Sequence, residues 1–496
     1  MLEKDIKNIV SRLILVDIQD PGILEKYPFA GYILFYKDID HSNNGWIKLK
    51  EMNEYYCRTF REKFGVNIFV SVDQEGGVVF RFDYPDFPAI CSQAVVPNEQ
   101  SAYILSKLNG YILKYLGFNL NFSPVMDVNT NTKNPIINIR SFSNDHKVVS
   151  LLSKKYIQGY NEANILCTGK HFPGHGDTSK DSHLELPIAD LTQEHLYPFF
   201  SNKSILPSIM SAHVVYRNID DLPATLSKKV LDLYQPYEGL VFSDALNMNA
   251  LKSYEWEEIL IKSLQAGVDI LLVLGNDELK TKSVEFLSKE FQKNPVFQKL
   301  IYSKYQKINK FIDKYTRNFK TSDLLLEEIS SMREWMFKEY HIPISYKGEL
   351  DLFRKKIYSN NHQSIFIFSN PYLRQIGINS QIKNLFEEMF KKKVEVEFVE
   401  VNELKEVENI QKSIGDEKLR LNNPILICHL TLDVQHESFI STLKSMGLRV
   451  IVISFSNPYV DADLVINVKG FSRVHLLNFK RWVYEFLEGI DGIDIV

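Results

Sequence analysis

Residues 147–170 read KVVSLLSKKYIQGYNEANILCTGK and contain the repeating unit from which the fold can be inferred. Up to Asn161 the apolar residues recur at the spacing of an amphipathic helix. Residues 165–170 (ILCTGK) then form an apolar run that is too short for a core helix. A parallel strand that is covered on both faces gives such a run. The stretch therefore predicts a helix, Lys147–Asn161, followed by a buried strand.

The same unit recurs through the first half of the chain. Short runs rich in β-branched and aromatic residues occupy residues 31–36, 67–72, 118–128, 165–170, 208–215, 239–244 and 269–274. Amphipathic stretches such as Tyr103–Tyr115 separate most of them. Seven or eight strand–helix units in about 275 residues predict an α/β fold of the TIM type, a (β/α)8 barrel. The same pattern is also compatible with an open doubly wound sheet, which is the alternative fold.

A second series of apolar runs follows a charged region. Residues 276–316 are rich in lysine with interleaved Glu and Asp, which is typical of solvated helix faces. Apolar runs return at residues 341–346, 364–368, 394–401, 424–430, 449–455 and 462–468. We therefore expect a barrel domain over residues 1–335 and a smaller, parallel, Rossmann-like α/β sandwich domain over residues 336–496. Neither GxGxxG nor a P-loop occurs there, so the sequence gives no support for nucleotide binding.

The composition excludes several classes of protein. The 496 residues are 45% hydrophobic and 24% charged, which is not the composition of a disordered tail. A formal net charge of −4 provides no global positive field for nucleic acid or an anionic membrane. The four cysteines form no CxxC pair, which favours a reducing compartment. We see no signal-peptide pattern and no apolar stretch of membrane-spanning length, so we expect a cytoplasmic location.

Several expected strands end in polar residues that a pure core would not contain. These residues are Asp73 to Glu75, Asp127, Asn129, Lys170, His171, His213 and Asp244. The carboxyl ends of the strands in a barrel all face one mouth, where pockets form. We therefore expect these side chains to converge on one site.

The densest polar segment is residues 169–187, GKHFPGHGDTSKDSHLELP. Its glycines and Pro173 indicate a shaped loop after a strand. Metal binding by His171, His175 and an aspartate is disfavoured, because HxxxH ligands need a helix and Pro173 prevents one. Acid–base chemistry by Asp181 and His183 is the other interpretation, since a nearby carboxylate orients an imidazole and raises its pKa.

Several elements, taken together and in order, resemble glycoside hydrolase family 3, in particular its NagZ-like β-N-acetylglucosaminidase branch. The elements are KHFPGHGDTSKDSH (170–183), VDQEGGVVFRF (72–82), FSPVMDVNTNTKNPIINIRSF (122–142), MSAHVVY (210–216), LPATLS (222–227), VFSDALNM (241–248) and AGVDILLV (266–273). The second half has weaker similarity to the two-domain members of the family.

The resemblance implies a catalytic role for three residues. Asp244 matches the catalytic nucleophile, His183 the acid/base and Asp181 its dyad partner. The residues that match the sugar-binding positions are Asp73, Arg81, Arg140, Lys170 and His171. The implied activity is retaining exo-hydrolysis of terminal β-linked N-acetylglucosamine through a covalent glycosyl–aspartate, with peptidoglycan fragments as substrates and no cofactor or metal.

The sequence also leaves alternatives to this activity. Ala245 stands where some relatives have a second acidic residue, and Val78 and Phe80 occupy positions that are often polar or basic. A phosphorylase that uses inorganic phosphate, a catalytically silent amino-sugar-binding protein and a metal-dependent hydrolase are the competing functions.

Two polar strand-end residues have competing structural interpretations. His213 is equally compatible with bonding a strand end or a substrate. Asp127 is expected to orient Arg140 or a loop amide rather than to contact sugar.

Overall fold

The computed structural model describes most of the first two thirds of the chain and parts of the remainder. The described residues are 2–131, 134, 136–178, 186–316, 323–338, 345–348, 353, 364–368, 385, 387, 395–399, 425–429, 440–441, 444, 449–455, 462, 464–470 and 472–491. The chain divides into two compact units. The first consists of Met1–Glu75 and Val79–Met336, and the second of Gly76–Val78 and Phe337–Val496.

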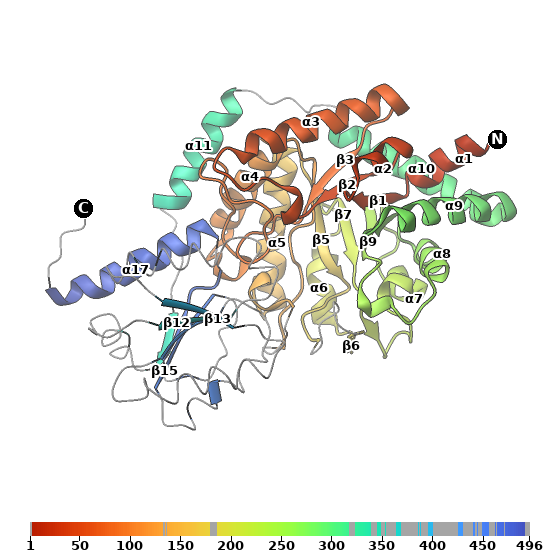
Figure 1. Ribbon diagram of the computed structural model, residues 1–496. Coiled ribbons are helices and arrows are strands. Elements are labelled where there is room, and N and C mark those ends of the chain that lie inside the picture. Colours follow the sequence, from red (N-terminus) through yellow and green to blue (C-terminus); the bar gives the residue numbers. More distant parts are fainter. Residues whose placement is uncertain are drawn as a thin grey trace. The chain divides into compact units, whose positions relative to one another are not determined.

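The first unit is built around a closed barrel of parallel strands (Figure 1). In chain order the strands are β1 (Ile14–Asp17), β2 (Gly31–Leu34), β3 (Phe69–Val72), β4 (Leu120–Asn121), β5 (Leu166–Phe172), β7 (Ser208–Ser211), β9 (Leu240–Ala245) and β10 (Ile270–Val273). The expected TIM-type barrel is confirmed. An open sheet is ruled out because β1 pairs with both β2 and β10, which closes the ring.

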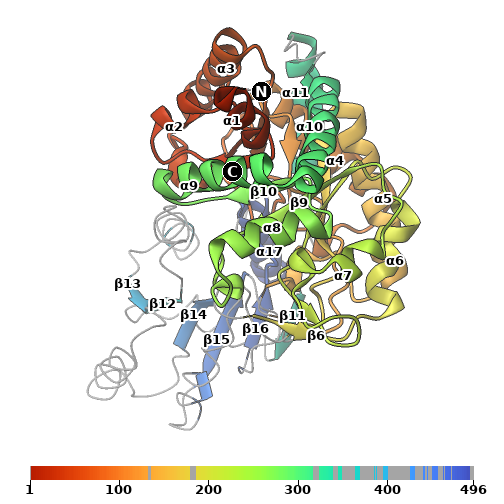
Figure 2. The same cartoon turned by 90° about the vertical axis from the view of Figure 1, so that its right-hand side faces the viewer.

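Helices cover the outside of the barrel (Figures 1 and 2). They are α1 (Glu3–Ser11), α2 (Pro21–Lys26), α3 (Gly45–Phe64), α4 (Glu99–Tyr115), α5 (His146–Ala163), α6 (Gln193–Asn202), α7 (Lys228–Asp232), α8 (Trp256–Ala266), α9 (Asp277–Lys293), α10 (Pro295–Thr316) and α11 (Asp323–Lys338). Short 3-10 turns lie at Tyr36–Asp38, Gln93–Val95, Asn138–Arg140, Ala224–Leu226 and Asn249–Leu251. Strands β6 (Ile188–Ala189) and β8 (Val215–Tyr216) form a separate pair.

The α5–β5 unit shows how the sequence forms this architecture. The side chain of Asp145 accepts a hydrogen bond from the amide of Lys147 and caps the start of α5. Asn164 has a φ of 57°, a left-handed conformation that ends the helix. Every residue of β5 is buried, as a strand between a barrel interior and a helix layer requires.

The second unit contains a six-stranded sheet in the order β11-β16-β15-β14-β12-β13. Its elements are β11 (Ser345–Gly348), β12 (Ser364–Phe368), β13 (Glu395–Val399), β14 (Ile425–His429), β15 (Val450–Ser454), β16 (Leu464–Asn467) and α17 (Arg473–Asp491). The expectation of an all-parallel sheet was wrong at β11, which pairs antiparallel with β16. An edge strand has only one partner, so its direction can reverse without disturbing the other strands.

None of the helices within the described residues combines the length and the apolar character that crossing a membrane requires.

Candidate active site

The carboxyl ends of three barrel strands bring predicted site residues to one rim. Asp73 directly follows β3, Lys170 and His171 lie near the end of β5, and Asp244 lies near the end of β9. Around the barrel these strands follow the order β9, β7, β5, β4 and β3. Asp244 is therefore separated from Lys170 by one strand, β7. The expected convergence of polar strand ends follows directly from the parallel barrel.

A chain of alternating charges connects five side chains at this rim. Lys170 Nζ lies 2.8 Å from a carboxylate oxygen of Asp73 and 2.6 Å from one of Glu75. Arg140 donates to both oxygens of Glu75, at 2.9 Å from Nε and 2.8 Å from Nη2. Arg81 Nη2 donates to Asp73 at 3.1 Å. The order is therefore Arg81, Asp73, Lys170, Glu75 and Arg140, which we call the charge ladder.

The charge ladder is more buried at its centre than at its ends. The side chains of Lys170 and Glu75 are 2% and 3% exposed, whereas Asp73 is 17% and Arg81 12% exposed. Ion pairs at such burial are costly to break, because removing one partner leaves an uncompensated charge away from water. The centre is therefore a fixed support, and Asp73 and Arg81 can present polar atoms to a ligand.

The two carboxylates of the charge ladder are held in their ionised form. Burial alone would raise the pKa of Glu75, but the charges of Arg140 and Lys170 outweigh it and lower the pKa to about 2. Burial likewise opposes ionisation of Asp73, and Lys170 and Arg81 lower its pKa in spite of it. Burial opposes the charge of Arg140, but Glu75 nevertheless raises its pKa. All three groups are thus charged near neutral pH.

Asp127 organises the beginning of the loop that follows β5. Its fully buried carboxylate accepts hydrogen bonds from the backbone amides of His171 at 3.1 Å and His175 at 2.6 Å. His171 Nδ1 also lies 2.7 Å from Asp127, so the imidazole turns its Nε2 away from this carboxylate. The interpretation of Asp127 as a holder of loop amides is confirmed, and the same carboxylate orients His171.

The loop after β5 packs tightly against its surroundings as far as Thr178. Tyr216 donates to the carbonyl of Gly174 at 2.5 Å, and Asn134 donates to the carbonyl of His175 at 2.8 Å. A Cβ on Gly176 would lie 1.8 Å from the carbonyl oxygen of Val128, so only glycine allows this approach. As expected from its glycines and Pro173, the segment from Pro173 to Thr178 is not helical.

His183 and Asp181 lie outside the described residues, since the description stops at Thr178 and resumes at Leu186. Their placement opposite Asp244 therefore stays a prediction.

His213 supports the strand end that carries Asp244. Its Nε2 donates to the carbonyl oxygen of Ala245 at 3.0 Å, and its Nδ1 lies 2.8 Å from the hydroxyl of Thr225. Of the two interpretations of His213, the structure shows the bond to a strand end. The half-buried Asp244 accepts a hydrogen bond from the amide of Ala245 at 2.7 Å.

Glu75 is among the polar strand-end residues that the sequence predicted to converge, but sequence reasoning gave it no role in the site. It lies two positions after Asp73 in the DQEGG element, and it pairs with both Lys170 and Arg140. Its position directly after a strand was the available signal. In the part of the chain that the structure describes, no group of three or more His, Cys, Asp or Glu side chains could hold a metal ion.

Comparison with known sequences identifies relatives of the barrel. The sequence model of the glycosyl hydrolase family 3 N-terminal domain matches residues 1–310. A beta-hexosaminidase of Idiomarina loihiensis is 32% identical over 274 residues, which cover 52% of this chain and 80% of that protein. A beta-hexosaminidase of Histophilus somni is 30% identical over 334 residues, covering 63% and 89%. Beta-hexosaminidase A of Pseudoalteromonas piscicida is 31% identical over 281 residues, covering 51% of this chain and only 46% of that protein.

Solved structures share the fold. A glycoside hydrolase family 3 beta-N-acetylglucosaminidase from a Paenibacillus species has a TM-score of 0.73 and 20% identity, with 97% of this chain and 96% of that chain covered. A beta-N-acetylhexosaminidase from Beutenbergia cavernae has a TM-score of 0.57 and 22% identity, covering 61% and 97%. The sequence matches extend this likeness from fold to family: the chain belongs to glycoside hydrolase family 3 and is a glycoside hydrolase.

Proposed function

We propose that this chain is a retaining exo-β-N-acetylglucosaminidase that releases terminal β-linked N-acetylglucosamine from peptidoglycan fragments. The names of its relatives, beta-hexosaminidase in each sequence comparison above, support the sugar class. The observation that carries the proposal is the charge ladder. Its partly exposed Asp73 and Arg81 provide an acceptor and a donor for sugar hydroxyls, and the buried Lys170 and Glu75 hold them in place.

Asp244 is the proposed nucleophile. Its carboxylate attacks the anomeric carbon as the bond to the leaving oxygen breaks, and a glycosyl ester of Asp244 forms. Protonated His183, paired with Asp181, gives its proton to the departing oxygen. The neutral His183 then takes a proton from water, whose oxygen attacks the anomeric carbon and releases Asp244. An imidazole suits both steps because it titrates near neutral pH.

Two p-nitrophenyl β-glycosides that differ only at the 2-position test the sugar class and the presence of catalysis together. We expect the 2-acetamido substrate to have a kcat/KM at least about a hundredfold above that of the 2-hydroxyl substrate, because a site built to bind a polar group rejects the analogue that lacks it. Comparable values would contradict the specificity. Binding of N-acetylglucosamine without release of nitrophenol would instead identify a sugar-binding protein.

The same assay with inorganic phosphate separates a hydrolase from a phosphorylase. We expect free N-acetylglucosamine as the product at all phosphate concentrations. Formation of N-acetylglucosamine 1-phosphate in proportion to phosphate would show that phosphate, rather than water, accepts the sugar. Loss of activity in EDTA would point to a metal-dependent reaction. Comparison of cell-wall disaccharides with chitin disaccharides, by their kcat/KM values, tests the proposed substrate source.

A further inference from the structure

A large cavity formed by described residues lies at the opposite end of the barrel from the candidate active site. It has a volume of about 1140 Å³. Pro207 and Gly239 in its lining stand directly before strands β7 and β9, and Asn164 stands two residues before β5. All three strands are parallel, so the cavity opens at their amino ends, whereas Asp244 and Lys170 lie at their carboxyl ends. The volume slightly exceeds the usual range for small-molecule sites.

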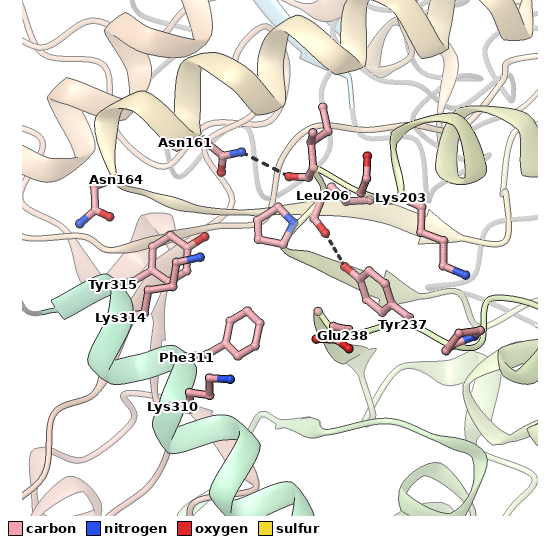
Figure 3. A pocket seen from close by; sticks show the side chains of 15 residues that line it. Asn161, Asn164, Lys203, Leu206, Tyr237, Glu238, Lys310, Phe311, Lys314 and Tyr315 are labelled. Carbon is pink, nitrogen blue, oxygen red and sulfur yellow. Dashed lines mark hydrogen bonds between the residues drawn. The ribbon is translucent and has the colours of Figure 1, made fainter.

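Three lysines border this cavity from two sides (Figure 3). Lys310 and Lys314 project from α10, and Lys203 projects from the segment after α6. Among the described residues none of these three ammonium groups forms an ion pair, although Glu238 also lines the cavity. The cavity therefore carries an excess of positive charge.

Two other lysines of the same helix, Lys304 and Lys307, are neutralised. Lys307 Nζ lies 2.7 Å from a carboxylate oxygen of Asp269, and Lys304 Nζ lies 3.5 Å from the other oxygen. Lys304 and Lys307 thus form ion pairs, whereas Lys310 and Lys314, further along the same helix, line the cavity.

The walls between the lysines include the aromatic rings of Tyr237, Phe311 and Tyr315. The ring of Phe311 projects from α10 toward Glu238, and Tyr237 lies on the opposite side (Figure 3). The Tyr237 hydroxyl donates to the carbonyl of Leu206 at 2.9 Å, which fixes that ring in place. Lys203 Nζ lies 4.8 Å from the centre of the Tyr234 ring, a cation–π contact that holds this side chain beside the cavity.

We propose that this cavity binds a phosphate ester of a hydroxyl-bearing ring compound, such as a sugar or a nucleoside. Lys310 and Lys314 stand one turn apart on α10, and a phosphate dianion matches two such ammonium groups better than a single carboxylate does. The ring compound packs against Phe311 and Tyr237, and the carboxylate of Glu238 accepts a hydrogen bond from one of its hydroxyls. This site is separate from the proposed hydrolase site and does not depend on the reaction assigned to it.

Binding of AMP and of glucose 6-phosphate to the full chain, measured by titration calorimetry, tests the site. Adenosine, glucose and inorganic phosphate serve as the separate parts of these probes. We expect at least one ester to bind with a Kd below about 1 mM and at least about tenfold more tightly than its parts. Because exposed charges are screened, raising the salt concentration to 0.5 M should weaken this binding. If neither ester binds, the proposal is wrong.

The double variant Lys310→Glu/Lys314→Glu locates the binding. We expect it to weaken ester binding by at least about tenfold and to abolish the rise in Tm that the ester causes in the wild type. Lys299→Glu is the matched control, because Lys299 is an exposed lysine of the same helix that does not line the cavity. Unchanged glycosidase activity shows that the double variant is folded. Equal ester binding by the double variant and the wild type would place the binding elsewhere and overturn the proposal.

Discussion

At the scale of single residues, Asp244 is the clearest test of the proposed chemistry. Asp244→Ala should lower kcat by more than about a thousandfold, since it removes the carboxylate that is proposed to form the glycosyl ester. Its Tm should change little, because Asp244 is only half-buried and its carboxylate bonds the adjacent amide of Ala245. The measurement is turnover of an activated aryl glycoside together with thermal unfolding.

Azide provides the control for Asp244→Ala. The small anion can occupy the space left by the carboxylate and attack the anomeric carbon itself. We expect restored release of the aryl group and an α-linked glycosyl azide as the product. Wild-type turnover by Asp244→Ala without azide would remove Asp244 from the mechanism.

Glu75 is predicted to be a positioning residue for the charge ladder. Glu75→Gln leaves Lys170 and Arg140 without their shared anion, so we expect a loss of about 3 kcal/mol in unfolding free energy. We also expect kcat/KM to fall by at least about tenfold, because the displaced Lys170 no longer orients Asp73. Urea unfolding and steady-state kinetics on the aryl glycoside measure the two effects.

Glu99→Gln is the matched control for Glu75→Gln. Glu99 pairs with Lys155 at 3.3 Å, but its side chain is 47% exposed. An exposed pair contributes about 0–1 kcal/mol, so this variant should be near wild type in both measurements. If the two variants behave alike, the charge ladder has no special role.

The sequence identified functional side chains by their position directly after a strand. It could not identify the side chains that form hydrogen bonds or ion pairs with them. Asp73, Lys170 and Asp244 were recognisable because charged residues rarely end a buried apolar run without a function. The pairing of Glu75 with Arg140 joins residues 65 positions apart, and no local pattern encodes it. The contact of His213 with Ala245 likewise depends on β7 and β9 pairing side by side in the closed barrel.

At the scale of elements, the apolar runs predicted where most strands lie but not how long they are. The strands β12 to β16 lie within predicted runs, whereas β5 continues beyond its run to Phe172, and the run 118–128 contains only the short strand β4. Strand β1 (Ile14–Asp17) was not among the predicted runs, because Arg12 and Asp17 interrupt the apolar stretch around it. Both charges are buried: Arg12 donates to the carbonyls of Phe29 and Asn67, and Asp17 lies 3.1 Å from Lys280. Tertiary partners that the sequence does not reveal make such a strand acceptable.

We predict that the close contact between Gly176 and the carbonyl of Val128 holds the loop after β5 in the position that catalysis needs. In Gly176→Ala the new Cβ would meet the carbonyl of Val128 at 1.8 Å, so the loop must shift. We expect kcat/KM to fall by at least about tenfold, and by more on poor leaving groups than on activated aryl glycosides, because the shift displaces the proposed acid His183. Kinetics on two substrates with different leaving groups measure this difference.

Gly22→Ala serves as the control for Gly176→Ala. Its Cβ would lie 3.4 Å from the nearest atom, an ordinary contact, and it stands in α2. Alanine favours a helix, so activity should be unchanged and stability unchanged or slightly higher. An equal loss on good and poor leaving groups in Gly176→Ala would separate the loop from the proton transfer.

At the scale of the whole molecule, buried titratable groups make stability depend on pH in two ranges. Burial, assisted by electrostatic repulsion from His171, lowers the pKa of His175 from 6.5 to about 4. The unfolded chain therefore binds this proton first, and stability is lost as the pH falls from about 6.5 to 4. Glu75 has a pKa of about 2 in the folded chain against 4.5 in the unfolded chain, so its contribution is lost as the pH falls from about 4.5 to 2.

Two variants should therefore flatten different parts of one curve of unfolding free energy against pH. Each shift corresponds to about 3 kcal/mol at most. In His175→Gln the decline in unfolding free energy between about pH 6.5 and 4 should be smaller by up to about 3 kcal/mol. The decline between about pH 4.5 and 2 should be unchanged. Glu75→Gln should lower stability at pH 7 but reduce the further decline below about pH 4.5. Urea unfolding of both variants and of Glu99→Gln at pH 7, 5, 4 and 3 measures these changes. If the curves of unfolding free energy against pH are parallel for all the proteins, the fold does not shift the pKa of either His175 or Glu75.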